Sequence, residues 1–448
     1  MLIFKKNPES SRNYTNTQHI CFFPMKRISL TLFISLITIC LQAESFTDSL
    51  AIRLREADSI FLTNNLALLS QRYNISAEKA MIIQAKLWPN PLLHVEQVLY
   101  NPGRKEWLAI NNYGQQMIQI QQMILLAGKR NKRINMQTIQ SEMAEYEFYD
   151  LLRTLHYQLH STFYEVYYLQ QSAAMYQTEI GNLTKTVKLY EEQYLIRNIP
   201  LKEIVRLKAF LFTLEGEYKE VLNRIYNVQA ELHLLLSLTS KPYIIPTLDI
   251  DYLSKIQVSG LNPVVLEDSA LTNRADLHLM EANTRYAQNN LALQRALAYP
   301  DLNAGAVWDR GANYIPNYYG LTLEVSLPAF NRNQGNIKAA KYQTDAANTD
   351  LEYYTLNVET DVNSAYLQLL EAEKLFRQYE LGFNKEFDQL IDGIIINYEK
   401  RNISLLEFID FYESYKNHVV LYNRLSGERM KAIENINYTT GSSFFILD

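Results

Sequence analysis

The sequence has very little cysteine, and both cysteines lie near the start of the chain. Cys21 and Cys40 precede residue 44, and no thiol follows them. Beyond that point the chain therefore has no disulfide, no cysteine nucleophile and no thiolate metal site. Lipidation of Cys40 is not expected, because Ile39 stands before it where a small residue is needed.

The first 43 residues have the pattern of an export signal. Lys26-Arg27 precede an apolar stretch, Ile28–Leu41, and Ala43 follows it. A positive region, an apolar region and a small residue at the cleavage point are typical of a secretory signal. The stretch is too short for a permanent membrane helix. We expect translation to start at Met25 and residues 1–43, an upstream extension and signal peptide, to be absent from the folded protein.

The sequence also lacks long apolar runs, a large net charge and catalytic motifs, and each absence excludes a class of function. After the signal there is no run of about 20 apolar residues, so no transmembrane helix is expected. The 43 basic and 48 acidic residues nearly balance, which argues against nucleic acid as a partner. Only 14 glycines accompany 32 tyrosines, which favours helices with half-exposed amphipathic surfaces. No nucleophile elbow, phosphate-binding glycine loop or cofactor motif is present, so we expect neither an enzyme nor a cofactor.

What the chain does contain is an internal duplication. Three segments recur in order, with small changes in loop length: 85–90 as 296–301, 160–164 as 363–367, and 194–203 as 398–407. The repeating unit of about 200 residues is too long for a solenoid. We expect a first repeat over 44–240, an equatorial linker over 241–263 and a second repeat over 264–448.

Each repeat is predicted to contain a helix, two strands, a very long helix, a tight turn and a returning helix. The strands are expected near 92–100, 115–125, 301–309 and 319–327, where apolar and polar residues alternate. The long helices are expected at 129–196, 201–238, 334–400 and 405–436. A helix of nearly 70 residues is roughly 100 Å long. Such helices are typical of coiled coils and helical barrels.

The predicted strands create a closure problem. Alternation and terminal aromatics such as Trp308 and Tyr319 suit a membrane barrel. Four strands cannot close one, and an open edge in lipid leaves backbone groups without partners. Three copies would supply twelve strands. The fold class we expect is mainly α with a membrane β-barrel portion, in which a trimeric 12-stranded barrel continues into a long α-helical barrel.

The chain resembles the TolC-type outer membrane efflux protein family, in particular its CzcC-like, heavy-metal branch. The resemblance is carried by Leu87–Leu92, Leu126–Arg130, Leu327–Ile337 and the paired turns at Arg197 and Arg401. It implies a homotrimer in the outer membrane of a Gram-negative bacterium, with a helical tunnel across the periplasm. It also implies a periplasmic adaptor protein and an inner-membrane RND-type pump as partners, and passive conduction of metal ions or drugs.

The resemblance also assigns site residues. In the family, acidic residues just past the second turn line the periplasmic aperture, which here are Glu407 and Asp410; Glu203 and Arg206 are their counterparts in the first repeat. Three copies of each acid near one axis would favour cations, and Arg206 could pair with Asp410 and hold the mouth shut. The alternative is that all of these residues are ordinary surface charges.

The two turns are the expected contacts for the adaptor. The residues concerned are Arg197, Asn198, Ile199, Leu201, Arg401, Asn402, Ile403 and Leu405. The isoleucines and leucines either anchor the adaptor or hold each hairpin together. The family usually has glycine at this turn, and we expect the asparagines to adopt the left-handed conformation in its place.

One histidine pair has the spacing of a metal site. His156 and His160 are four residues apart on a predicted helix, so both imidazoles face one side, a spacing that can bind zinc. No third ligand is evident nearby in the sequence. We therefore interpret the pair as polar helix surface and predict no metal site.

Two other functions fit parts of the pattern. A type I protein-secretion outlet would share the architecture and differ in cargo. An exported coiled-coil scaffold without a pore would leave the alternating strands at 302–308 and 319–327 unexplained.

Overall fold

The computed structural model describes residues 49–108, 114–258, 260–311, 315–380, 393–398 and 400–446. Apart from the first 48 residues, the chain forms one compact unit, Ser49–Asp448. The predicted export signal at 1–43, with Cys21 and Cys40, lies outside the described residues.

Helices make up most of this unit. Their bounds are α2 Leu54–Asn64, α3 Leu66–Lys86, α4 Lys129–Leu195, α5 Leu201–Leu236, α6 Ile250–Ser254, α7 Pro263–Asn273, α8 Ala275–Leu297, α9 Gln334–Glu380 and α11 Leu405–Thr440. The predicted helix over 334–400 appears as α9 and a helical segment at 393–398, and its remaining part falls on residues that are not described. In the described ranges, every helix is too short or too polar to cross a bilayer.

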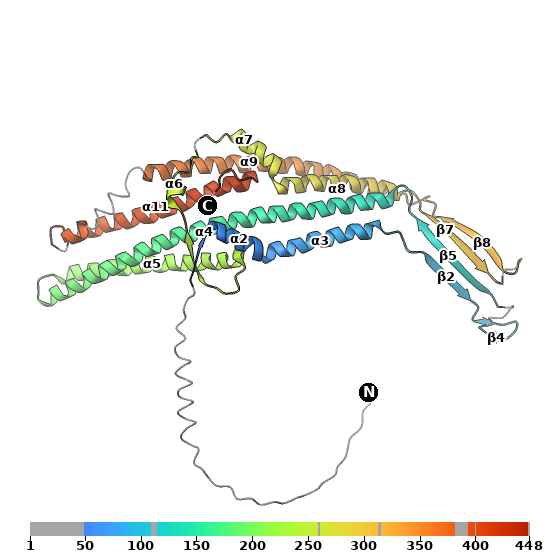
Figure 1. Ribbon diagram of the computed structural model, residues 1–448, viewed down its shortest axis with the longest axis horizontal. Helices are drawn as coiled ribbons and strands as arrows, with labels where there is room; N and C mark the ends of the chain where they lie inside the picture. The colour runs from blue at the N-terminus through green and yellow to red at the C-terminus, as the bar shows by residue number, and fades with distance from the viewer. Residues whose placement is uncertain are drawn as a thin grey trace, which may run out of the picture. The chain divides into compact units, whose positions relative to one another are not determined.

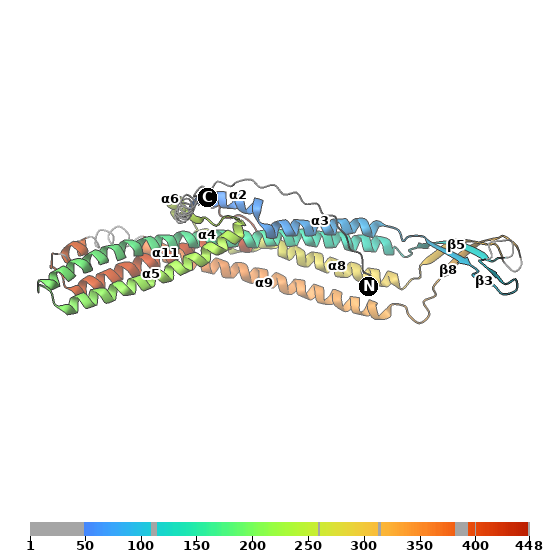
Figure 2. The ribbon, with the colours of Figure 1, turned by 90° about the horizontal axis from the view of Figure 1, so that it is seen from below.

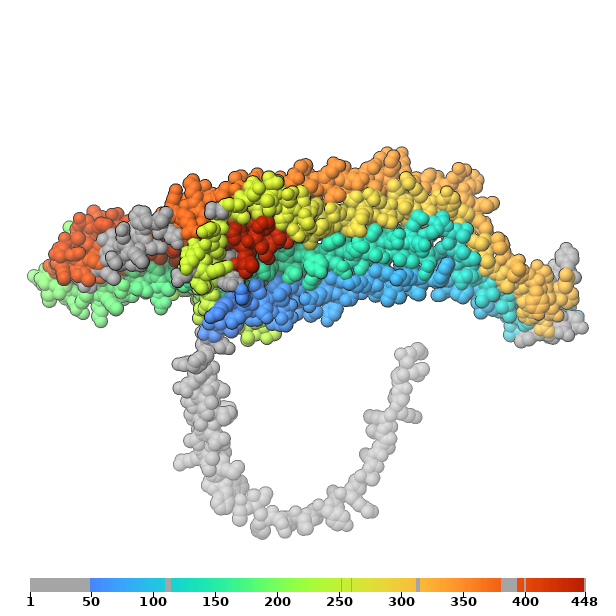
Figure 3. All heavy atoms as spheres, turned by 45° about the horizontal axis from the view of Figure 1, so that its top comes forward, coloured from blue at the N-terminus to red at the C-terminus, as the bar shows by residue number. Residues whose placement is uncertain are grey.

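Four helices lie side by side as a curved layer. Helix α3 contacts α4, α4 contacts α8, and α8 contacts α9, which Figure 3 shows as successive blue, teal, yellow and orange bands. Helix α11 packs on both α4 and α9, and α5 returns along α4. The hairpin turns lie at one end of this unit and the strands at the other (Figures 1 and 2).

Two apolar clusters hold the helices together. The larger one is formed by α2, α4, α5, α9 and α11 around residues such as Phe61, Phe163 and Met430. The second lies towards the hairpin turns, where the ring of Phe408 stacks on that of Tyr398 at a centroid distance of 4.2 Å. Each buried side chain of this size stabilises the fold by about 2 kcal/mol. The long helices are thus stabilised by packing against neighbouring helices.

The predicted strands form a single antiparallel sheet. Its order is β2 (Leu92–Gln97), β5 (Gln116–Ile124), β7 (Leu302–Asp309) and β8 (Tyr318–Val325). The first strand is shorter than expected, because the chain leaves the sheet after Gln97. It then forms a separate small hairpin, β3 (Tyr100–Asn101) with β4 (Glu106–Trp107).

The linker over 241–263 contains regular structure. Strand β6 (Tyr243–Thr247) pairs in parallel with β1 (Ser49–Arg53), at the start of the described chain. The side chain of Gln229 on α5 donates to the backbone carbonyl of Ile244 at 2.6 Å and accepts from its N–H at 3.1 Å. The amide therefore ties the linker to the helices.

Candidate functional site

The register of the sheet separates an apolar face from a polar one. Residues paired directly across antiparallel strands share a face. One such row joins Val95, Ile118, Trp308 and Tyr319, and the next joins Leu93, Ile120, Ala306 and Leu321. Leu321 is 92% exposed, although it belongs to an ordered strand. A water-facing sheet would have polar residues along such rows.

The opposite face is polar. One of its rows joins Gln119, Val307 and Gly320, and the next joins Gln121, Gly305 and Thr322. Gln119 donates its side-chain amide to the Thr322 hydroxyl at 3.3 Å. Gln119 and Gln121 of β5 thus lie on the polar face of the sheet. Gln122, on the apolar side, bonds to the carbonyl of Pro89 at 2.8 Å.

The sheet is open at both edges. In the described chain, β2 pairs only with β5, and β8 pairs only with β7. The outer sides of β2 and β8 therefore carry backbone N–H and C=O groups available to further strands. An exposed, apolar, unpaired edge is a surface that strongly favours addition of another strand.

The two helical turns at the other end have the same geometry. Arg197 and Arg401 have φ values of 64° and 60°. Each arginine N–H donates to the carbonyl three residues before it, and the next asparagine N–H donates to the carbonyl five before it. This pattern is a Schellman motif, whose left-handed position is usually glycine. The expectation that the asparagines would be left-handed is therefore wrong, because the arginines precede them in that position.

The asparagines instead brace the turns through their side chains. Asn198 donates to the Gln193 side chain, and Asn402 to that of Asn397, both at 3.0 Å. Arg197, Asn198, Arg401, Asn402 and Leu201 are exposed, whereas Ile199 is buried and Ile403 and Leu405 pack against the second cluster. Of the apolar turn residues, only Leu201 is therefore exposed at the surface, and the other three pack inside the hairpins.

The predicted aperture residues lie just beyond these turns. Glu407 and Asp410 are exposed on α11, Arg206 is exposed on α5 and Glu203 is half-buried there. Ser404 and Glu407 form a capping box, in which the Ser404 N–H donates to the Glu407 carboxylate at 2.8 Å. That bond lowers the pKa of Glu407. Within the described residues of one chain, Arg206 and Asp410 form no ion pair.

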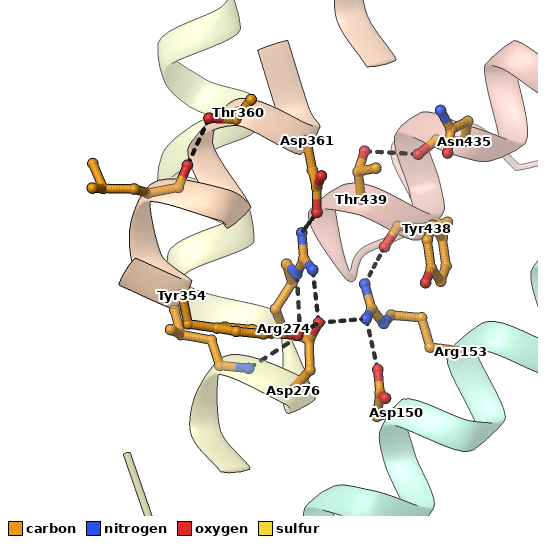
Figure 4. Close-up of polar contacts among 12 residues, drawn as sticks. Asp150, Arg153, Arg274, Asp276, Tyr354, Thr360, Asp361, Asn435, Tyr438 and Thr439 are labelled. Carbon is orange, nitrogen blue, oxygen red and sulfur yellow. Dashed lines mark hydrogen bonds and ion pairs between the residues drawn. The ribbon is translucent and has the colours of Figure 1, made fainter. Parts of the chain in front are cut away.

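A buried charge network joins α4 to α8 and α9 (Figure 4). Asp276 on α8 accepts from Arg274 at 2.7 Å, from Arg153 of α4 at 2.8 Å and from the Tyr354 hydroxyl of α9 at 2.8 Å. Burial opposes the charged carboxylate, but the hydrogen bond from Arg274 and the charge of Arg153 outweigh it and lower the pKa of Asp276 to about 2. Arg274 also reaches Asp361 at 3.2 Å.

A second polar cluster lies between α2, α4 and α11. The Asp58 carboxylate is 2.9 Å from Nε2 of His160 and 3.3 Å from Nε2 of His156. Nδ1 of His160 bonds to Glu434, which is almost fully buried. Burial disfavours the charged imidazole, but the hydrogen bonds and charges of Asp58 and Glu434 raise the pKa of His160 to about 9. The pair seen in the sequence is therefore not plain helix surface.

Sequence reasoning missed Asp58, Glu434, Arg274 and Asp276. Asp58 and Glu434 are each more than a hundred positions from His160, so no local spacing connects them. Arg274 and Asp276 flank the start of α8, where an acidic residue is also explained by the helix dipole. The sequence therefore offers no local signal for any of these four residues, although it does single out the histidine pair.

Comparison with known proteins agrees with this architecture. Residues 266–382 match the family of outer membrane efflux proteins. The chain is 22% identical over 392 residues to the cobalt-zinc-cadmium resistance protein CzcC of Cupriavidus metallidurans, covering 87% of this chain and 90% of that protein.

Solved structures give the same fold. The CmeC outer membrane channel of Campylobacter jejuni superposes with a TM-score of 0.72 at 12% identity, over 87% of this chain and 85% of that one. The open state of the MtrE outer membrane channel of Neisseria gonorrhoeae gives 0.70 at 14% identity, over 87% and 89%. The family match over residues 266–382, the relative CzcC and the shared fold agree: in all three comparisons this chain is similar to outer membrane efflux proteins.

Proposed function

We propose that three copies of this chain form an exit duct of a tripartite, RND-type efflux system. The strands would close a 12-stranded barrel in the outer membrane, and the helices would continue it as a tube across the periplasm. Residues 44–240 and 264–448 would act as two repeats joined at the linker 241–263. Conduction through such a duct is passive, and the pump supplies the energy.

The observation that carries this proposal is the sheet with one apolar face and two open edges. Val95 and Leu321 stand on that face, at β2 and β8, and are 61% and 92% exposed. Lipid accepts such a face only when every backbone group is bonded. Pairing β8 of one copy with β2 of the next satisfies both edges, and three copies give an even strand number within the known range.

The helical layer supports the same assembly. Its outer helices, α3 and α9, have exposed apolar residues, including Tyr73 and Ile83 on α3 and Tyr353 and Leu356 on α9, all at least 60% exposed. Apolar surface on both edges of a layer favours contact with further layers. Contact of α3 with α9 of the next copy would bury these residues and close the tube.

The hairpin ends are the proposed periplasmic mouth. Glu203, Arg206, Glu407 and Asp410 from three copies would surround the aperture. The exposed turn residues Arg197, Asn198, Leu201, Arg401 and Asn402 would contact the adaptor. Arg197 and Arg401 have the left-handed backbone conformation, which costs roughly 1 kcal/mol for each residue. Such strain is typical of positions where the side chain has a function.

The cargo we favour is metal ions, with drugs as the other class. The observation behind this preference is the relative CzcC, a cobalt-zinc-cadmium resistance protein. The test is the sensitivity of a deletion strain to zinc, cobalt, cadmium and common drugs, with purified protein examined in planar bilayers. The duct is supported if the deletion strain is sensitive to metals, the reintroduced gene restores its resistance, and the purified protein gives single-channel currents. A strain of normal resistance whose protein gives no current would overturn it.

A further inference from the structure

The cluster of Asp58, His156 and His160 has the donor set of a zinc site. The three ligand atoms, one from each residue, all lie within 4.8 Å of one another. Two imidazole nitrogens and one carboxylate oxygen are ligands that Zn²⁺ accepts, and a site with three protein ligands keeps its fourth position for water. We propose that these residues bind a zinc ion, or a divalent cation of similar preference such as Co²⁺.

The distances suit such an ion. In a tetrahedral zinc site with bonds near 2.0–2.1 Å, neighbouring ligand atoms are about 3.3 Å apart. Asp58 Oδ1 lies 2.9 Å from His160 Nε2 and 3.3 Å from His156 Nε2. The two imidazole rings are close together, with centroids 4.0 Å apart. Small side-chain rotations are enough to surround an ion.

Glu434 gives the cluster its second feature of a metal site. Its buried carboxylate bonds Nδ1 of His160, so Nε2 of the same ring points to Asp58. A ligating histidine almost always donates its other ring N–H to a carboxylate, carbonyl or water, which fixes the tautomer. Asn437 in turn donates to Glu434 at 3.3 Å. The ion would replace the proton on Nε2 and leave the bond to Glu434 intact.

The site also has an entry path. Asp58, His156, His160 and Glu434 line one cavity of about 620 Å³. The His156 side chain is 41% exposed, whereas that of His160 is 5% exposed. A hydrated ion can therefore reach His156 and Asp58 first and then bind His160. Bound there, it links α2 to α4 next to α11. This inference does not depend on what the duct conducts.

The test is metal binding by the purified full chain, without a polyhistidine tag. Zn²⁺ is titrated calorimetrically, and Co²⁺ reports geometry through its visible absorption. We expect one ion per chain and the intense absorption of tetrahedral Co²⁺. We expect His156→Gln and Asp58→Asn each to weaken Zn²⁺ binding by at least about tenfold, since loss of even an outer-shell partner typically costs about ten- to a hundredfold in metal affinity. His156 is partly exposed, so its variant should fold.

His278→Gln is the matched control. His278 lines the same cavity but bonds to Glu281 at 3.0 Å, away from the cluster. Its variant should bind Zn²⁺ as the wild type does. Three results would overturn the proposal: no bound ion, only weakly absorbing octahedral Co²⁺, or equal losses in His156→Gln and His278→Gln.

Discussion

Arg153 of α4 donates to the carboxylate of Asp276 on α8 at 2.8 Å, and this contact connects two residues 123 positions apart in the sequence. Both side chains are about 90% buried. Asp276 also accepts from Arg274 and from the Tyr354 hydroxyl. A buried carboxylate satisfied by three donors is costly to disturb, since within the described chain Arg153 would keep only Asp150, and Arg274 only Asp361, as an acidic partner.

This network predicts an acid-sensitive stability. The pKa of Asp276 is lowered from 3.8 to about 2 in the folded chain, so its contribution is complete above pH 3.8. It is lost as the pH falls from there through about 2, and amounts to about 2 kcal/mol. Thermal melting followed by circular dichroism at about pH 5 and about pH 2.5 measures the loss.

Asp276→Asn is the control for that measurement. The variant should be less stable than wild type near neutral pH by about 3 kcal/mol, and its melting temperature should fall less on acidification. If wild type and variant lose the same stability between the two pH values, Asp276 is not the group responsible.

The left-handed arginines predict opposite effects on stability and on binding. Arg401→Gly should raise stability by about 1 kcal/mol, because glycine adopts positive φ without the steric cost. Arg401→Ala keeps that cost and should not stabilise. Both variants lack the guanidinium, so both should bind the periplasmic adaptor more weakly in a pull-down. An adaptor bound equally well by all three proteins would remove Arg401 from the contact surface.

Much of this fold follows from the sequence, because its patterns are local or repeated. The duplicated turns at Arg197 and Arg401 share one geometry, and β7 and β8 begin and end within two residues of the alternating segments. Period-two alternation reports directly which side chains share a face. The long helices α4 and α9 contain no proline, so the sequence predicts them as helices.

The remainder depends on contacts between distant residues. The pairing of β1 with β6 joins Ile52 to Pro246, and nothing near either residue indicates the other. The same holds for Asp58 and Glu434 around His160. At the turns, an asparagine tolerates positive φ more readily than arginine does, but the hydrogen bonds of the Schellman motif select the position.

The proposed aperture role of Glu407 and Asp410 predicts an effect on ion selectivity. Asp410→Asn and Glu407→Gln each remove one negative charge per copy, and glutamine can keep the capping bond to Ser404. Both variants should reduce cation preference in planar-bilayer recordings. Glu413→Gln, which alters another exposed acid on α11, should leave the currents unchanged. Selectivity equal in all four proteins would exclude Glu407 and Asp410 from the aperture.

In the proposed duct, other copies of the chain must close the open edges of β2 and β8. Native mass spectrometry of the protein extracted from outer membranes in detergent counts those copies directly. We predict a particle of three chains. A particle of one or two chains, stable and with its strands formed, would contradict it.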